Sequence, residues 1–371
     1  MPIQRSPGTD MAGESAPAAA REPVRIGVIG GADIARRRLL PAFAAEPGCQ
    51  IVAIASRDAE RARELAGRYD CAAVTGYERL LADPRVEAVY VPLPIALHAE
   101  WIERALLAGK HVLGEKPLTS TPAATARLYA LAGARGLVLV ENFMFRHHSA
   151  HARVRELLAQ GTIGQLRHLT AVFAIPPPPP GDIRYRPDLG GGALLDIAVQ
   201  PLFAVLHFLG PRVRVCGASL RRPAQHQVDT GGAILLAASD GVTAQVVFGM
   251  EHGYRAAYEL WGSSGRITVE RAYAPPADYR PVIRLELASG TEELVLEPDD
   301  QVRNAVRAFS AAIRERSRAT DWERSVALAQ LLADVDAADR ATAARRPIGA
   351  PPADGLSRAD GRVQTGSGAG R

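Results

Sequence analysis

The chain has few cysteines and no long apolar run. Its 371 residues include three cysteines, Cys49, Cys71 and Cys216, which are far apart and form no C-x-x-C pair. So few thiols argue against a disulfide scaffold and against a zinc site. We therefore expect no bound metal and a cytoplasmic location, where the thiols stay reduced. Because no stretch is apolar for long enough to span a bilayer, we also expect no membrane contact.

The chain also lacks a basic segment of the kind that binds nucleic acid. The formal net charge is +4, from 44 basic and 40 acidic residues, and the arginines are spread along the chain. This distribution fits an anionic small ligand better than a nucleic acid polymer. The hydrophobic share of 47% is ordinary for a globular protein, and the length allows two domains, each with its own core.

Lysine is the scarcest charged residue, since only Lys110 and Lys116 occur among the 44 basic residues. Unlike the guanidinium of arginine, the lysine amine is a compact charge whose pKa shifts when it is buried. Lys116 follows the apolar segment 111–114 and precedes Pro117. That position is the carboxyl end of a predicted strand, where open α/β sheets bind ligands. Two interpretations remain open at this point: an ionisable group in a binding site, or a surface lysine at a turn.

The first half of the chain carries the pattern of a dinucleotide-binding fold. Residues 24–29 predict a buried strand that ends in a glycine turn and leads into a helix. Strands and helices then alternate to about residue 140, which predicts an α/β fold with a doubly wound parallel sheet. The fingerprint G-x-G-x-x-G/A falls on Gly30, Ala32 and Ala35, with alanine in place of the middle glycine. The residues of this turn that we expect at the dinucleotide are Gly30, Ala32, Asp33 and Ile34.

The end of the second predicted strand favours NADP over NAD. Ser56 and Arg57 follow the apolar segment 50–55. NAD enzymes carry Asp or Glu here for the ribose 2′-hydroxyl, whereas a hydroxyl and a guanidinium suit a 2′-phosphate. We therefore expect Ser56 and Arg57 to bind NADP. The alternative is that Arg57 only begins the arginine-rich helix that follows.

The pattern changes after about residue 145. A helix is predicted at 147–160, a strand at 166–175, five consecutive prolines at 176–180, and mostly strands from residue 213. Short turns between these strands predict a largely antiparallel sheet. No second helical layer follows to cover its outer face, so we expect a homodimer or homotetramer built through this sheet. The predicted division is a disordered tail at 1–23, a dinucleotide-binding domain at 24–145, a substrate-binding and oligomerisation α+β domain at 146–345, and a disordered tail at 346–371.

Several short motifs make the chain similar to one family. They are the Gly30 turn, Pro92-Leu93-Pro94 with His98, Gly109-Lys110-His111-Val112 leading into Glu115-Lys116-Pro117, and Glu141-Asn142. On these motifs, and over about residues 24–345, the chain resembles the glucose-fructose oxidoreductase/inositol dehydrogenase (Gfo/Idh/MocA) family, whose first domain is a Rossmann fold. The resemblance implies that Lys116 lies beside the nicotinamide and the reacting carbonyl. It also places Leu93, His98, Glu115 and Asn142 at the cofactor.

Motifs of the second half resemble one branch of that family. Residues 182–186, the glycine-rich run 190–196 and residues 259–263 are similar to the NDP-sugar 3-ketoreductases. This resemblance implies that the chain uses NADPH to reduce a C3 carbonyl on a dTDP-linked 6-deoxyhexose, in deoxysugar and antibiotic biosynthesis. The branch also resembles dihydrodiol and xylose dehydrogenases. An NADP-dependent dehydrogenase of a free sugar, polyol or dihydrodiol therefore remains the alternative.

One residue departs from the family pattern. Four residues after Asp196 the family has a Tyr or His that partners the lysine, and here that position holds Gln200. An amide can orient a carbonyl by donating a hydrogen bond, but it cannot supply a proton. Three consequences stay open. Lys116 alone protonates the developing alkoxide, another group such as Tyr185 takes the acid role, or the chain binds NADP and a sugar nucleotide without turnover.

The remaining site residues follow from the same resemblance. Arg184 matches a cofactor-proximal arginine, and we expect Asp196 to bind a sugar hydroxyl or Lys116. His147 and His151 have the spacing of metal ligands, but no third ligand accompanies them. The predicted substrate contacts are Lys116, Phe145, Arg146, Tyr185, Asp196 and Gln200.

Overall fold

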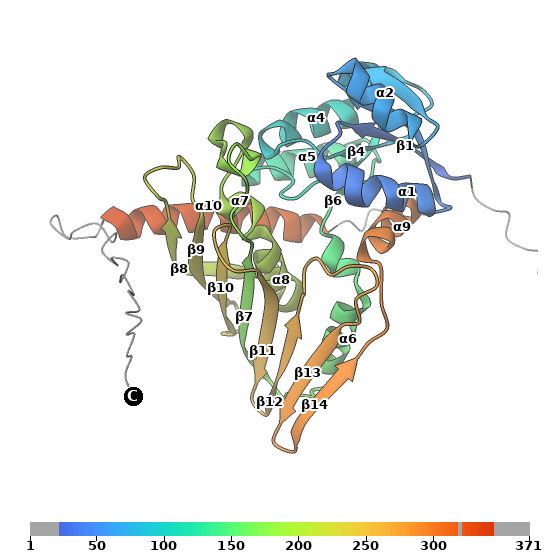
Figure 1. Cartoon of the computed structure of the whole chain (residues 1–371). Coiled ribbons are helices and arrows are strands. Elements are labelled where there is room, and N and C mark those ends of the chain that lie inside the picture. The colour runs from blue at the N-terminus through green and yellow to red at the C-terminus, as the bar shows by residue number, and fades with distance from the viewer. Residues whose placement is uncertain (1–21, 318–320, 345–371) are drawn as a thin grey trace, which may run out of the picture.

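The computed structural model describes residues 22–317 and 321–344, which form two β-sheets joined by helices (Figure 1). The six-stranded sheet has the order β3-β2-β1-β4-β5-β6, and the eight-stranded sheet has the order β14-β13-β12-β11-β7-β10-β9-β8. The tail predicted at 346–371 and residues 1–21 of the tail predicted at 1–23 lie outside the described residues. The predicted α/β fold class, a parallel Rossmann sheet plus a second, mainly antiparallel sheet, is confirmed.

Every strand pair of the six-stranded sheet is parallel. Its strands are β1 (Val24–Ile29), β2 (Cys49–Ser56), β3 (Ala72–Thr75), β4 (Ala88–Val91), β5 (His111–Gly114) and β6 (Leu139–Glu141). The strand order reverses between β1 and β4, and such a reversal opens a crevice at the carboxyl ends of the strands. The glycine turn after β1 and the Lys116 loop after β5 both lie at that edge.

Helices cover both faces of this sheet, as the strand–helix alternation predicts. They are η1 (Ala35–Leu39), a π-helical turn continuous with α1 (Leu40–Ala45), and then α2 (Ala59–Gly67), α3 (Tyr77–Ala82), α4 (Ile95–Leu107) and α5 (Pro122–Ala134). The sequence pattern missed β3. Its four residues alternate between half-buried and exposed, and two of them are alanine, which has low strand propensity.

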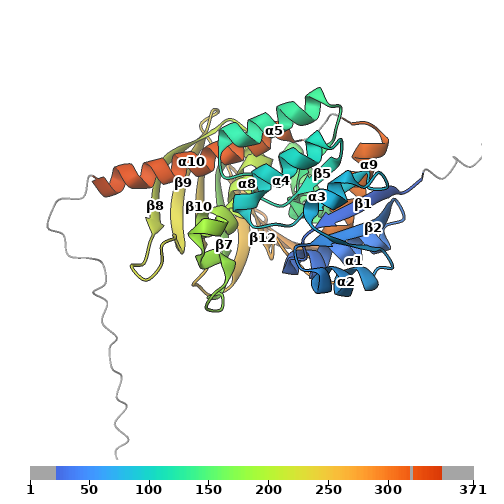
Figure 2. The same ribbon diagram turned by 90° about the horizontal axis from the view of Figure 1, so that it is seen from above.

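The eight-stranded sheet has one parallel pair, β7 with β10, and its other pairs are antiparallel. Its strands are β7 (Leu166–Ala174), β8 (Val213–Arg221), β9 (Gly231–Ala238), β10 (Thr243–Gly249), β11 (Arg255–Gly262), β12 (Gly265–Glu270), β13 (Val282–Leu287) and β14 (Gly290–Val295). Figure 2 shows α10 (Trp322–Ala344) along one side of this sheet. Leu235 and Trp261 point to the opposite side, and they are 49% and 47% exposed.

The segment between β6 and β8 supplies the helices that meet the crevice. They are η2 (Met144–His147), α6 (Ser149–Ala159), η3 (Ile183–Tyr185), η4 (Pro187–Leu189), α7 (Ala193–Asp196) and α8 (Val199–Leu209). The sequence predicted one helix from the glycine run to about Leu209. The structure divides it into α7 and α8, with a bend of 48° between residues 187–196 and 199–209.

Among the described residues, no single helix is long and apolar enough to cross a membrane. The bent pair of residues 187–196 and 199–209 meets that test of length and composition only when its two parts are taken together. The second helix of the pair, α8, is largely buried in the core against β7 and β10.

The last two helices return to the body of the protein. α9 (Gln301–Arg314) packs with Val306, Phe309 and Ile313 into the core that contains Ile26 of β1 and Phe43 of α1. α10 packs on β8, α8 and α5. The predicted boundary at residue 145 stays a prediction, and α9, which follows the second sheet in sequence, belongs by packing to the first.

Candidate active site

Lys116 lies on the loop after β5 and donates two hydrogen bonds to one residue. Its Nζ is 2.8 Å from the main-chain oxygen of Asp196 and 2.7 Å from the carboxylate Oδ1. Its side chain is 16% exposed. An ammonium has three N–H donors, so one remains for a ligand in the crevice. The structure thus brings together two residues that the sequence singled out 80 positions apart.

Arg184 of η3 holds the other carboxylate oxygen of Asp196. Its Nε is 2.6 Å from Asp196 Oδ2, and its Nη1 is 3.2 Å from both carboxylate oxygens of Asp182. Four charged side chains therefore form one chain from Lys116 through Asp196 and Arg184 to Asp182. Asp182 was missed by the sequence analysis as a site residue, although it opens the motif at 182–186.

The charges around Asp196 keep it ionised. Burial by itself raises the pKa of this carboxyl, but the positive charges of Lys116 and Arg184, and the hydrogen bonds from both, lower it well below its usual range. The pKa of Arg184 is raised in return, because the attraction of Asp196 and Asp182 outweighs its desolvation. Asp196 is therefore a fixed anion that holds the ammonium of Lys116.

Glu115 and Asn142 lie beneath the lysine loop rather than open to solvent. Glu115 Oε1 accepts hydrogen bonds from the Tyr90 hydroxyl at 2.6 Å and from Asn142 Nδ2 at 2.8 Å. All three residues are buried. The hydrogen bonds link the ends of β4, β5 and β6, so this group fixes the strand ends that carry the site. Tyr90 gave no signal in the sequence beyond an apolar strand.

His98 fastens two loops at the same edge of the sheet. Its Nδ1 lies 2.9 Å from the main-chain oxygen of Pro117, and its Nε2 lies 2.7 Å from that of Leu93. Burial is the main cause that lowers its pKa. A neutral imidazole donates from only one nitrogen, so only one of the two carbonyl oxygens accepts its N–H in a given tautomer. The structure gives His98 the role of tying the loop after β4 to the lysine loop.

The glycine turn after β1 is shaped by α2 and by the loop after β4. Gly30 has φ +98, and a Cβ there would come within 3.0 Å of the Leu93 side chain. At Gly31 a Cβ would meet Leu65 at 2.4 Å, and Arg61 donates to the Gly31 carbonyl at 2.5 Å. These contacts pack the backbone of the turn closely against α2 and the loop after β4, with no room for a Cβ at either glycine. This is the geometry that a dinucleotide pyrophosphate needs.

Asp33 and Arg57 differ in their partners. Asp33 forms ion pairs with Arg36 and with Arg37, the latter at 2.6 Å. Ser56 Oγ accepts from the Asp58 amide at 3.1 Å, and Arg57 is exposed with no ion pair to any residue described. Ser56, rather than Asp or Glu, ends β2, where NAD enzymes carry the ribose-binding carboxylate. Arg57 is thus available to an anionic ligand at the end of β2.

Gln200 is the second residue of α8 and lies four positions after Asp196 in the chain. Its Oε1 is buried without a hydrogen-bond partner among the described residues. An unsatisfied buried amide oxygen costs about 1–3 kcal/mol. A hydrogen-bond donor of a bound ligand or water would remove this cost.

Three predicted substrate contacts have partners away from Lys116. Phe145 is buried against Phe203 and Tyr273, at ring-centroid distances of 5.9 and 5.4 Å. Arg146 forms an ion pair with Asp321. Tyr185 stacks on His226 with ring centroids 4.4 Å apart, and its hydroxyl lies 3.5 Å from Glu251 Oε1. No hydrogen bond joins any of the three to the Lys116–Asp196 pair, so their predicted contact with substrate stays a prediction.

Of the two histidines with metal-ligand spacing, His151 is buried in the core and His147 is half-buried. His151 Nδ1 lies 2.8 Å from the Tyr258 hydroxyl, and its Nε2 lies 2.9 Å from the Ala272 carbonyl. Within residues 22–317 and 321–344, no group of three or more His, Cys, Asp and Glu side chains has the arrangement of a metal site.

Comparison with known proteins agrees with this arrangement. A family model described as "Oxidoreductase family, NAD-binding Rossmann fold" matches residues 24–143, and the "GFO/IDH/MocA C-terminal domain" matches residues 151–268. The chain is 55% identical over 302 residues (81% of this chain, 88% of the other) to dTDP-3,4-didehydro-2,6-dideoxy-alpha-D-glucose 3-reductase of Streptomyces violaceoruber. It is 53% identical over 294 residues (79% and 89%) to the enzyme of the same name from Saccharopolyspora spinosa.

A solved structure shares the whole fold. It is KijD10, a 3-ketoreductase from Actinomadura kijaniata in complex with NADP and TDP-benzene, with a TM-score of 0.83 at 49% identity. The match covers 85% of this chain and 98% of that one. Together with the two family models and the glycine turn, lysine loop and second sheet described above, these similarities show that the chain belongs to the Gfo/Idh/MocA family of oxidoreductases.

Proposed function

We propose that the protein reduces the C3 ketone of a dTDP-linked keto-6-deoxysugar with NADPH. The observation that carries this proposal is the paired geometry of Lys116, whose two bonds to Asp196 leave one N–H free at the carboxyl edge of the sheet. The curated relatives at 50–55% identity are named for 3-reduction of a dTDP-sugar, which supports the same substrate class.

NADP fits the residues that would hold it. The turn at Gly30 has φ +98 and packs closely on the loop after β4, as the tight turn of a dinucleotide fingerprint does, and Ala32 and Ile34 follow it. Arg57, which is exposed and has no ion pair with a described residue, offers its charge to a 2′-phosphate. When bound, NADPH supplies the hydride that reduces the carbonyl carbon. KijD10 is described with NADP, which supports this choice of cofactor.

The chain's own residues act on the carbonyl oxygen. As negative charge develops there, the free N–H of Lys116 stabilises it and then transfers its proton to form the hydroxyl. Asp196 stays ionised throughout and keeps the amine in place. Arg184 donates a hydrogen bond to the second carboxylate oxygen of Asp196 and so holds this carboxylate in its orientation.

Gln200 is assigned to substrate contact rather than to acid catalysis. Solved variants of KijD10 replace one lysine and one tyrosine, and these lie as far apart in that chain as Lys116 and Gln200 do here. This chain therefore carries an amide where KijD10 carries a phenol. Tyr185, the other candidate acid, is engaged with His226 and Glu251, which favours Lys116 as the sole proton donor.

The experiment measures NADPH oxidation with a dTDP-3-keto-6-deoxyhexose made in situ, for the native chain, Lys116→Ala and Gln200→Tyr. We expect native turnover that is lost in Lys116→Ala while NADPH still binds. Activity on free sugars or dihydrodiols alone would favour the dehydrogenase alternative. No native turnover, with activity appearing in Gln200→Tyr, would favour a non-catalytic NADP-binding protein, the alternative suggested by Gln200.

We also propose that the open face of the eight-stranded sheet joins two copies of the chain, as a homodimer or within a homotetramer in the cytoplasm. Leu235 and Trp261 lie on this face and are 49% and 47% exposed. Light scattering of the native protein and of a Leu235→Glu, Trp261→Glu double variant tests the proposal. We expect a multimer for the native chain and a smaller species for the variant, and a native monomer would contradict it.

A further inference from the structure

The helix that carries Asp196 is too short to be stable without contacts from other elements. α7 contains four residues, Ala193–Asp196, and it is preceded by Gly192, whose φ is +116. A single helical turn has little stability of its own, because nucleation costs more than one hydrogen bond returns. The position of Asp196, and with it that of Lys116, must therefore be fixed by contacts from outside the helix.

Asp229, in the turn that leads into β9, supplies these contacts. Its main-chain oxygen accepts from the Ala193 amide at 2.9 Å, and its Oδ2 accepts from the Leu194 amide at 2.6 Å. The first N–H groups of a helix have no partner within the helix. One residue, 35 positions further along the chain, thus satisfies two of them at α7. Gly192, the residue before α7, has no side chain that could accept these hydrogen bonds.

The fit between Asp229 and the glycine before α7 is close. A Cβ at Gly192 would lie 2.7 Å from Asp229 Oδ1, so only glycine leaves room for this carboxylate. Asp229 is itself held in the sheet, because the next residue, Thr230, donates to Arg221 at 2.8 Å and accepts from Met250 at 2.9 Å. The second sheet is therefore hydrogen-bonded to α7 through Asp229.

We propose that Asp229 is a positioning residue for the reaction, because it caps α7 and so sets where Asp196 holds the ammonium of Lys116. The inference rests on the proposed function for its kinetic consequences. The contacts that link β9 to Lys116, through Asp229 and α7, do not depend on the identity of the substrate.

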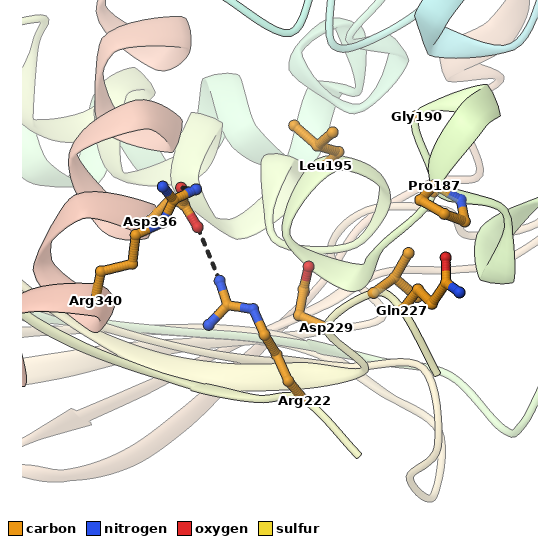
Figure 3. A pocket seen from close by; sticks show the side chains of 10 residues that line it. Pro187, Gly190, Leu195, Arg222, Gln227, Asp229, Asp336 and Arg340 are labelled. Atoms are coloured by element: carbon orange, nitrogen blue, oxygen red, sulfur yellow. Dashed lines mark hydrogen bonds and ion pairs between the residues drawn. The ribbon is translucent and has the colours of Figure 1, made fainter. Parts of the chain in front are cut away.

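The electrostatic surroundings make this cap sensitive to pH. Asp229 lines a pocket of about 480 Å³ together with Arg222 and with Asp336 and Arg340 of α10 (Figure 3). Burial raises the pKa of Asp229 to about 6, and the negative charge of Asp336 adds to this, while the Leu194 amide and Arg222 oppose it. Arg340 is paired to Asp336 at 2.5 Å. Protonation of Asp229 weakens its bond to the Leu194 amide, so turnover should fall below about pH 6.

The test compares native protein with Asp229→Ala and Asp229→Asn. Asp240→Asn is the matched control, because Asp240 also accepts a main-chain amide, that of Val242 at 3.1 Å, at the far end of the β9–β10 hairpin. We expect kcat to fall on the order of tenfold in Asp229→Ala, since small displacements of a catalytic group are costly. The KM for NADPH should stay unchanged. The acid limb near pH 6 should disappear in Asp229→Asn and persist in Asp240→Asn.

A second arm separates positioning from a general loss of stability. In a Lys116→Met background, Asp229→Ala should cause no further loss of the residual rate. Equal losses in both backgrounds, or an unchanged acid limb in Asp229→Asn, would overturn the inference.

A third arm reads Lys116 directly, by its rate of reductive methylation in folded protein. We expect faster modification of Lys116 in Asp229→Ala, because its amine is released from Asp196. If the native chain shows no turnover, the proposed function fails and this arm alone decides the inference. An unchanged rate of modification then overturns it.

Discussion

Lys116 meets Asp196 twice, through the main-chain oxygen at 2.8 Å and through the carboxylate Oδ1 at 2.7 Å. The first contact depends only on the position of α7, and the second depends on the charge of the side chain. The ammonium is thus located by the backbone and neutralised by the carboxylate. This separation allows the two effects to be tested one at a time.

Replacing Asp196 with Asn should keep the first contact and weaken the second. The charge that balances Lys116 and Arg184 is lost, and removal of one partner from a buried ion pair costs about 3 kcal/mol. We expect kcat to fall at least tenfold and the free energy of unfolding in urea to decrease. An Asp182→Asn variant, which alters the far end of the same network, should have the smaller effect on kcat. The reverse order would contradict the assignment of Asp196.

Preference for NADPH over NADH should depend on Arg57. Arg57→Ala removes an unpaired cation at the end of β2, and each charge-assisted bond to a phosphate contributes about 1.5–3 kcal/mol. We expect the KM for NADPH to rise at least tenfold, with little change for NADH. Arg63→Ala, at an exposed position of the adjacent helix α2, is the control. Equal effects on the two cofactors would remove Arg57 from the phosphate site.

Gln200→Leu should stabilise the protein while weakening its use of substrate. The change removes a buried amide oxygen that has no partner in the described structure, which should add about 1 kcal/mol to the free energy of unfolding. The KM for the sugar nucleotide should rise, because the amide no longer contacts it. Urea unfolding and steady-state kinetics measure the two effects. A loss of stability would show that the oxygen is satisfied in the free protein.

The buried histidines should make the protein sensitive to acid. Burial lowers the pKa of His151 to about 3 and that of His207 to about 4, below the ordinary value of 6.5. The unfolded chain then binds more protons than the folded one between pH 6.5 and about 4. The free energy of unfolding should therefore decrease as the pH falls through this range. His207→Phe, at a site that already faces Phe145, should reduce the slope, whereas an unchanged slope would point to other groups.

The scarcity of lysine makes Lys116 a selective target for amine reagents. Lys110 is 8% exposed, and its Nζ donates to the carbonyls of Asp83 and Val86 at 2.9 and 2.7 Å. Apart from the terminal amine, reductive methylation should modify Lys116 before Lys110, and NADPH with a dTDP ligand should slow it. Peptide mass spectrometry measures both rates. Faster modification of Lys110 would mean that the loop after α3 opens in solution.

Much of the fold follows from local sequence. The alternation of strands and helices predicted the parallel sheet, and the short strands after residue 213 predicted the second sheet, because periodicity and turn residues are local properties. The missed β3 and the break between α7 and α8 show the limit of that reasoning. A half-exposed strand of four residues and a bend inside an apolar helix are stabilised by neighbours that are distant in the chain.

By itself, the sequence singled out Lys116 as a candidate reactive group, through its rarity and its place at a strand end, and it predicted Asp196 and Arg184 for the same site. Only the tertiary structure decided what these residues do to one another. In the structure, both carboxylate oxygens of Asp196 accept from cations, and the side-chain oxygen of Gln200 has no hydrogen-bond partner among the described residues. Phe145 and Arg146 contact residues other than Lys116 and Asp196. The structure also introduced Asp229, which no local pattern marks. The physical reason is that a hydrogen bond depends on distances of a few tenths of an ångström between residues far apart in sequence, and only packing fixes such distances.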